Sequence, residues 1–299
     1  MRTIAGYLWN FVRSVRPVVA AAVLLFTGLL VWTNYYFGLE RALMDTPTAP
    51  RLLLWWLLFA VAFAVPVWLQ SGSGAGRLLR KPGYLVLLLA APLIFALKLA
   101  LPLNLPLHPV PLDNRYWNLV LYYPAKLLLT VVLLYVLWRR YHRDAPFYGT
   151  GAGGSLRPYW GMLLFMVPLV ALASTQADFL ATYPKFQHLA PVRAASLSKQ
   201  LLYELSYGSD FITIELFFRG FLVLAFARYL GTGAVLPMAV FYCAIHFGKP
   251  LGECISSFFG GIVLGVATFH SRSIWGGLLV HLGIAWLMEL GGYLGRLSS

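Results

Sequence analysis

The feature that most constrains this chain is a succession of apolar stretches, each close to the length that crosses a membrane. The hydrocarbon core of a bilayer is about 30 Å thick and needs about 20 residues of helix. Stretches of this kind alternate with short polar loops at about residues 17–39, 52–69, 83–103, 117–138, 158–176, 210–229, 233–247, 254–270 and 274–294. Backbone that crosses lipid must satisfy its own hydrogen bonds, so we expect these stretches to be helical. The predicted fold is all-α, a polytopic membrane protein with about eight or nine transmembrane helices.

The composition agrees with a membrane protein and argues against a nucleic-acid partner. Only 11% of the 299 residues are charged, whereas a soluble domain carries about 25%. The net charge of +13 comes from basic residues in the short loops between apolar runs, which is typical of the positive-inside bias. We therefore expect the lipid bilayer as a partner and no nucleic acid. Cys243 and Cys254 lack a CxxC spacing and are predicted to be packing residues.

The loops predict the orientation and the division of the chain. Residues 1–16 contain three arginines among apolar and aromatic residues, so they are expected to lie as an amphipathic segment on the cytoplasmic surface. With this end inside, the inner loops hold more Lys and Arg than the outer loops. The prediction is a multi-pass protein of the cell membrane with a cytoplasmic N-terminus. The Gly/Ser-rich stretches 71–76 and 149–155 are expected to be flexible linkers. The second separates an accessory N-terminal half, residues 1–150, from a C-terminal core, residues 151–299.

Glu215 and Arg219 are a carboxylate and a guanidinium inside one apolar run. Residues at positions i and i+4 lie on the same face of a helix, so the two side chains can pair. Ionisable groups at bilayer depth are costly and mark a functional site by default. The alternative is a buried ion pair that only orients its helix.

Two histidines occur in later apolar segments. His246 ends the run at 233–247, where the simpler interpretation is an interfacial histidine bonded to a backbone carbonyl. His281 lies about 10 Å inside the last run at 1.5 Å per residue, so it needs a partner. We expect Glu215, Arg219, His246 and His281 to converge on one polar cavity. A carboxylate with two histidines can activate water directly, or can hold a divalent metal that does so; the interpretation allows a metal and does not require one.

The order and spacing of these residues resemble the CPBP family of intramembrane proteases, which includes the type II CAAX prenyl endopeptidases. The family pattern is Glu-Glu-x-x-x-Arg, then Phe-x-x-x-His, then His-x-x-x-Asn or Asp. This chain matches the second Glu and the Arg with Glu215 and Arg219, and it matches the second motif with Tyr242-Cys-Ala-Ile-His246. The stretch Ser273-Ile-Trp-Gly-Gly-Leu-Leu-Val-His281 resembles the residues that lead into the third motif.

The chain departs from the family pattern at two positions. Ile214 stands where the family has its first Glu, and Ala285 stands where it has Asn or Asp. Two nearby acids are candidates for the missing carboxylate. Asp210 lies one helical turn before Ile214, and Glu253 follows a Gly/Pro-containing turn that could bring it back towards His246.

The resemblance implies an intramembrane endopeptidase that cleaves a peptide or protein substrate near the membrane surface. The implied catalytic residues are Glu215 as base or orienting group, Arg219 as its ionic partner, His246 positioning water and His281 polarising the carbonyl. Glu253 is added to them by its position, as the favoured candidate for the missing carboxylate. The alternative is a catalytically inactive membrane scaffold or binding protein that uses the same polar pocket. A transporter is a third class, although a transporter of inverted repeats would carry broken or ionisable segments in both halves.

Overall fold

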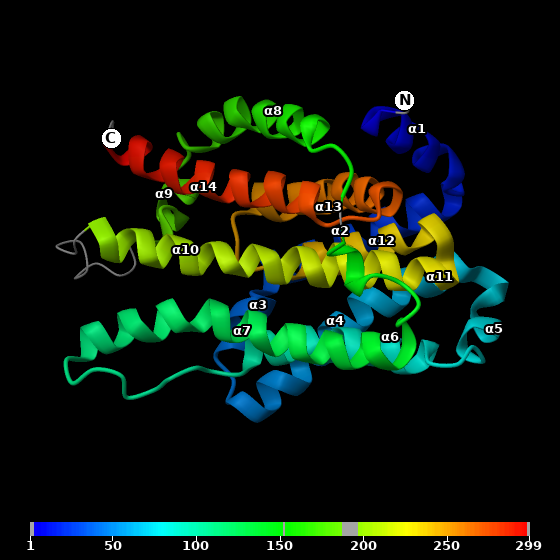
Figure 1. Cartoon of the computed structure of the whole chain (residues 1–299), viewed down its shortest axis with the longest axis horizontal. Coiled ribbons are helices and arrows are strands. Elements are labelled where there is room, and N and C mark those ends of the chain that lie inside the picture. Colours follow the sequence, from blue (N-terminus) through cyan, green and yellow to red (C-terminus); the bar gives the residue numbers. More distant parts are fainter. Residues whose placement is uncertain (1–2, 152, 187–196, 298–299) are drawn as a thin grey trace. The chain divides into compact units, whose positions relative to one another are not determined.

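All regular structure in the computed structural model is helical (Figure 1). The model describes residues 3–151, 153–186 and 197–297, and no strand occurs among them. The helices are α1 Ile4–Ser14, α2 Pro17–Phe37, α3 Leu39–Met44, α4 Thr48–Ser71, α5 Ala75–Leu79, α6 Tyr84–Ala100, α7 Pro111–Tyr141, α8 Arg157–Ala173, α9 Ala177–Thr182, α10 Leu197–Ile214, α11 Phe226–Leu230, α12 Val235–Ala244, α13 Leu251–Ser271 and α14 Trp275–Leu297. A π-helical segment, Glu215–Ala225, connects α10 to α11.

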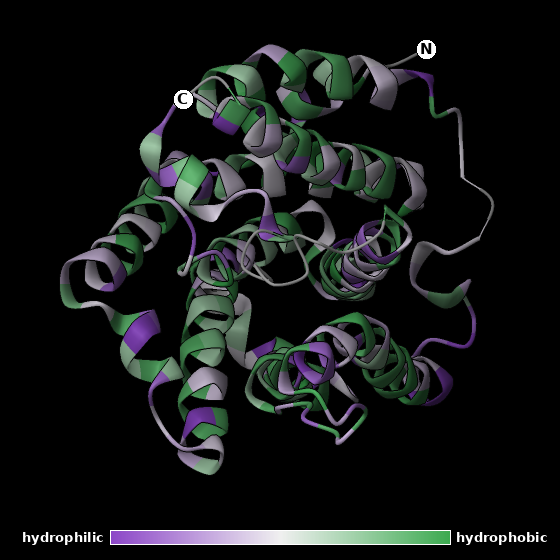
Figure 2. Ribbon diagram, turned by 90° about the vertical axis from the view of Figure 1, so that its left-hand side faces the viewer, coloured by the Kyte–Doolittle hydropathy of each residue, from purple (hydrophilic) through white to green (hydrophobic). Residues whose placement is uncertain are grey.

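Five of these helices are long and apolar enough to cross a membrane: α2, α4, α7, α13 and α14. Helices α6 and α8 are apolar and shorter. Hydrophobic residues dominate the helices (Figure 2). The all-helical class and the membrane character are therefore confirmed, whereas the count of eight or nine spanning helices stays a prediction.

Every predicted apolar span contains an observed helix, and the main difference lies around the motif. The sequence predicted an apolar span from about residue 210. In the structure α10 already covers Leu197–Ile214, and the π-helical segment and α11 follow it without a break in the helical turns. Gly208 lies inside α10, where an added Cβ would be in van der Waals contact with Leu282 and Trp286 of α14, at 3.4 and 3.5 Å. The linker expected at 71–76 is helical too, with a 3₁₀ turn at Gly72–Gly74 that leads into α5.

The chain divides into two compact units, each built from several stretches. The first contains residues 1–102, 132–154 and 216–274, and the second contains residues 103–131, 155–215 and 275–299. Both units draw residues from each of the two halves expected from the sequence. The division at residue 150 stays a prediction about function.

The core of the first unit is an aromatic cluster around α12, a helix buried along its whole length. The ring of Phe241 lies 4.8 Å from Phe59, 5.9 Å from Phe95, 5.8 Å from Phe217 and 5.3 Å from Phe218. Offset and edge-to-face pairs of this kind stabilise a core beyond the area that they bury. They fix the first residues of the π-helical segment against α12.

The second unit is organised on α14, which packs against α8 through small residues. Side chains added at Gly276 or Gly283 would overlap the Tyr159 ring or Leu163 of α8. Small residues let membrane helices approach closely. The opposite side of α14 faces α10, so this helix carries His281 between two neighbours.

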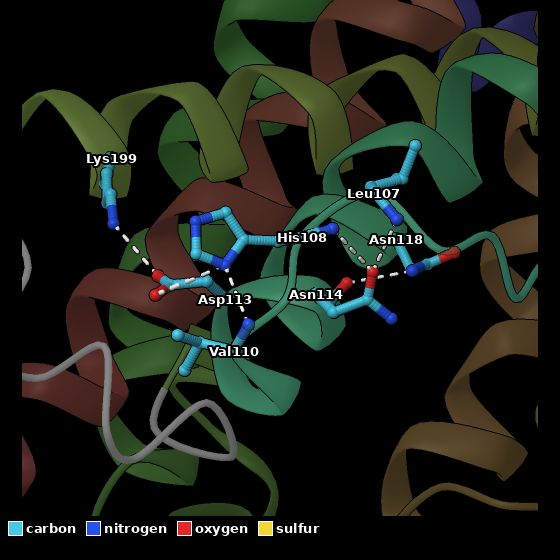
Figure 3. Close-up of polar contacts among 7 residues, drawn as sticks. All are labelled: Leu107, His108, Val110, Asp113, Asn114, Asn118 and Lys199. Atoms are coloured by element: carbon cyan, nitrogen blue, oxygen red, sulfur yellow. Dashed lines mark hydrogen bonds and ion pairs between the residues drawn. The ribbon is translucent and has the colours of Figure 1, made fainter.

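The extended segment before α7 is held by hydrogen bonds from amide side chains of α7 to its backbone (Figure 3). The side chain of Asn118 accepts from Leu105 N at 2.7 Å and donates to Leu105 O at 2.8 Å, and Asn114 accepts from Leu107 N at 2.7 Å. Since an exposed backbone polar group in or near lipid needs a partner, these amides allow an apolar, proline-containing connection without a helix.

Candidate active site

Glu215 is the first residue of the π-helical segment, and its side chain is completely buried. The carboxylate Oε1 lies 3.0 Å from His281 Nδ1, and both residues belong to the second unit. The ring of Phe211, one turn earlier on α10, packs edge-on against the His281 ring at 4.8 Å. Glu215 and Phe211 therefore hold the imidazole from two sides.

Gly277 makes room for the carboxylate. A Cβ added at this position would overlap Glu215 Oε2. Gly277 lies in the first turn of α14, where the positive end of the helix dipole stabilises a negative charge. A glycine at this place thus lets a buried carboxylate approach both the helix end and His281.

The geometry decides which imidazole nitrogen faces the carboxylate. A proton on Nδ1 donates to Glu215, which leaves Nε2 with its lone pair. The side chain of His281 is 15% exposed, whereas that of Glu215 is 0% exposed. Of the two side chains, only that of His281 has surface exposed to solvent.

A second polar cluster lies in the first unit and joins Arg219 to His246 through Tyr242. The guanidinium of Arg219, itself fully buried, lies 4.1 Å from the centre of the Tyr242 ring. A desolvated cation over an aromatic face is stabilised by about 2 kcal/mol or more. The His246 ring lies 4.6 Å from the same tyrosine, and its Nδ1 is 2.7 Å from Tyr242 O.

This last contact fixes the tautomer of His246. Because a carbonyl oxygen only accepts, His246 Nδ1 carries the proton and donates it to Tyr242 O. Nε2 is then an acceptor, suited to orient a water molecule. The simpler interpretation, a histidine bonded to a backbone carbonyl, thus describes this bond correctly.

The π-helical segment that begins at Glu215 is shaped by a turn of the first unit. A Cβ at Gly220 would overlap Tyr148 O and lie 3.1 Å from Tyr148 Cβ. Tyr148 has a left-handed conformation with φ of 39°, and Gly149 follows with φ of 78°. π-Helical turns occur frequently at functional sites, and here one lies between the glutamate and the arginine of the motif.

The two candidates for the missing carboxylate occupy different places. Glu253, in the first turn of α13, forms an ion pair with Lys249 at 3.2 Å. Asp210 is half-buried on α10, in the second unit. Ile214 and Ala285, at the divergent motif positions, are both buried.

The structure brings Glu215 together with His281, and it brings Arg219 together with His246 through Tyr242. The first pair belongs to one unit and the second cluster to the other. Convergence of all four side chains on one cavity stays a prediction. Among the described residues, no group of three or more His, Cys, Asp and Glu side chains is placed to hold a metal ion.

Sequence reasoning missed Phe211 and Gly277. Phe211 is one of many aromatic residues in apolar helices, so its contact with His281 leaves no separate signal. Gly277 has a partial signal, because it belongs to a Gly-Gly pair four residues before the histidine. A glycine there is compatible with close approach, but only the fold shows which group approaches.

The comparisons bear on the segment that contains these residues. Residues 208–287 match the family model described as Type II CAAX prenyl endopeptidase Rce1-like. This match confirms the resemblance to the CPBP family that the motifs indicated, and residues 1–207 lie outside it. No curated protein and no solved structure matches the chain.

Proposed function

We propose that this chain is an intramembrane endopeptidase of the CPBP type, which hydrolyses a peptide bond near the membrane surface. The observation that carries the proposal is the bond between the buried Glu215 carboxylate and His281 Nδ1, 3.0 Å long, inside the segment that matches the endopeptidase family. A glutamate fully withdrawn from solvent that orients a partly exposed histidine is the arrangement of a general base and its orienting group.

In the proposed reaction, His281 Nε2 takes a proton from water while the water oxygen attacks the scissile carbonyl carbon. Glu215 stabilises the imidazolium that forms and stays ionised. The same Nε2–H then protonates the leaving amide nitrogen as the C–N bond breaks. This sequence restores neutral His281 and leaves a new carboxyl and a new amino terminus. Because the carboxylate accepts from Nδ1 and orients the ring, we assign His281 as base rather than as polarising group.

Arg219 and His246 have supporting roles in the proposal. The guanidinium over the Tyr242 ring is fully buried and always charged, and we assign it to hold Tyr242, and with it His246, in place. In the first unit, His246 Nε2 is an acceptor suited to position a water molecule. Glu253 acts through its ion pair with Lys249, which fixes the start of α13 after the His246 turn.

The test is proteolysis by the full chain in lipid vesicles. The substrates are peptides with and without an isoprenyl group on a cysteine near the C-terminus, the products are identified by mass, and each peptide is assayed with and without a chelator. We expect one specific cleavage and its loss, to below about one-hundredth of the rate, in His281→Ala. The matched control is His270→Ala, because His270 stacks on Tyr7 in the first unit, outside the proposed site.

A second function is favoured by the two buried apolar residues at motif positions. Ile214 stands where the family pattern has a carboxylate, and Ala285 stands where it has an amide or a carboxylate; both residues are buried in this chain. A chain without these groups can bind a peptide without cleaving it. Binding of a family-type peptide by the wild-type chain, with no cleavage and no change on restoring Ile214→Glu, would favour this inactive scaffold over the protease.

A further inference from the structure

The turn that carries His246 is bound by residues far outside the segment that matches the family model. This turn, residues 246–250, connects α12 to α13. It is contacted by the corner between α2 and α3, which belongs to the same unit. This corner belongs to residues 1–150, which were predicted to be accessory, and its contacts indicate that it helps to hold the turn.

Asn34 makes the central contact. Its side chain is buried, 3% exposed, and its Nδ2 donates to Phe247 O at 2.9 Å. Its Oδ1 accepts from Glu40 N at 2.9 Å. An amide buried in an apolar helix is costly unless it is hydrogen-bonded, and both ends of this amide are used. One end fixes the corner, and the other end fixes the turn.

Two neighbours act on the same turn. The hydroxyl of Tyr35 donates to Lys249 O at 2.6 Å. The carboxylate of Glu40 lies against Gly248, where an added Cβ would be 2.9 Å from Glu40 Oε1. Residues 247, 248 and 249 are thus each in contact with the corner.

We propose that Asn34 is a positioning residue for His246. The imidazole of His246 is fixed by its Nδ1 bond to Tyr242 O, and the backbone that follows it is fixed by Asn34. Together the two bonds set where Nε2 points. The catalytic part of this inference rests on the proposed function, in which His246 Nε2 positions a water molecule.

The experiment replaces Asn34 with an apolar side chain of similar size, Asn34→Leu. The matched control is Thr27→Val on the same helix, because Thr27 is also buried and its hydroxyl bonds only within α2, to Val23 O. Tyr35→Phe is the milder variant, since it removes one hydroxyl from a partly exposed ring and keeps the helix core intact. The readouts are backbone hydrogen exchange over residues 246–250, and kcat and KM for cleavage in vesicles.

We expect Asn34→Leu to raise hydrogen exchange over residues 246–250 about tenfold or more, and to lower kcat about tenfold with KM unchanged, with Tyr35→Phe changing both in the same direction by less. Thr27→Val should change neither. Unchanged exchange in both Asn34→Leu and Tyr35→Phe would overturn the positioning role, and so would raised exchange with unchanged kcat. Raised exchange in a chain whose wild type cleaves no peptide supports the structural contact while overturning the proposed function.

Discussion

At the scale of single residues, the proposed site combines a buried carboxylate with a partly exposed imidazole. Glu215 has no exposure to water, so it cannot itself deliver a proton to a substrate. His281 contacts it through Nδ1, and in the proposed reaction Nε2 is the atom that takes the proton. This arrangement needs space for the carboxylate, and Gly277 supplies it.

Gly277→Ala tests whether that space matters. The added Cβ would overlap Glu215 Oε2, so the carboxylate must move and the imidazole loses its alignment. A misplacement of about 1 Å in a catalytic group costs about 100-fold in rate, and we expect a fall in kcat of this order. The control is Gly161→Ala on α8, where no other atom lies within 4 Å of the added Cβ. Equal activity of Gly277→Ala and Gly161→Ala would show that the carboxylate position is unimportant.

Residue identities in the motif could be predicted from the sequence, but most of their contacts could not. Glu215 and His281 were singled out because ionisable groups in apolar runs need partners. Asn34 offered the same kind of signal, a lone amide in an apolar run, and its partner lies 213 positions along the chain. Gly277 and Phe211 matter through close contacts with Glu215 and His281, and such contacts between distant residues cannot be read from the sequence.

At the scale of elements, the helix that carries the motif is not a uniform α-helix. The π-helical segment starts at Glu215, and the turn at Phe147–Gly149 lies against its Gly220. The sequence predicted the helix from its apolar run, but it did not predict the change of helix type or the contact with that distant turn. A local apolar pattern therefore predicts where a helix lies but not whether its turns are α-helical or π-helical.

Gly220→Ala should destabilise this contact. The methyl group would overlap Tyr148 O, and such overpacking typically costs about 1–3 kcal/mol. The expected result is a lower Tm in detergent, measured by the loss of helical circular dichroism. Gly260→Ala on α13 is the comparison, since its Cβ meets nothing within 4 Å and the alanine favours helix. A Tm for Gly220→Ala at or above that of wild type would contradict the described contact.

The same turn predicts a dependence of stability on pH. His142 is 3% exposed, its Nδ1 lies 3.0 Å from Tyr148 Oη, and burial together with the nearby Arg228 lowers its pKa from 6.5 to about 4. Between these values the unfolded chain binds a proton that the folded chain does not. The free energy of unfolding should therefore fall as pH falls from about 6.5 to about 4, by up to about 3 kcal/mol.

The measurement is Tm against pH for the wild type and for His142→Gln, which removes the titrating group. The decline between pH 6.5 and 4 should be smaller in His142→Gln. Parallel curves for the wild type and His142→Gln would rule out His142 as the source.

At the scale of the whole molecule, the chain is helical and apolar as its sequence predicts, and the number of spanning helices is the quantity left to measure. Each predicted apolar run became a helix because lipid and protein interiors alike require satisfied backbone. Their lengths did not follow, because α12 ends after ten residues and α6 and α8 are short. A hydropathy pattern locates apolar segments, but their ends depend on turns and caps formed with other parts of the chain.

The distribution of Lys and Arg predicts that residue 76 lies inside and residue 197 outside. In a chain with Cys243 and Cys254 replaced by alanine, Gly76→Cys and Leu197→Cys should react with an impermeant thiol reagent from opposite sides of the membrane. Both positions are suitable for labelling, because Gly76 has no neighbouring atom within 4 Å of its Cβ position and Leu197 is 69% exposed. Labelling from one side only would contradict the predicted topology.

The central claim is that Glu215 orients His281 as the base of an endopeptidase. Its most direct test is kcat and KM of Glu215→Gln, compared with wild type in the same vesicles. The amide keeps the shape and removes the charge that holds the Nδ1–H tautomer and stabilises the imidazolium, so kcat should fall about 10³- to 10⁴-fold with little change in KM. A kcat within about threefold of wild type would contradict the account.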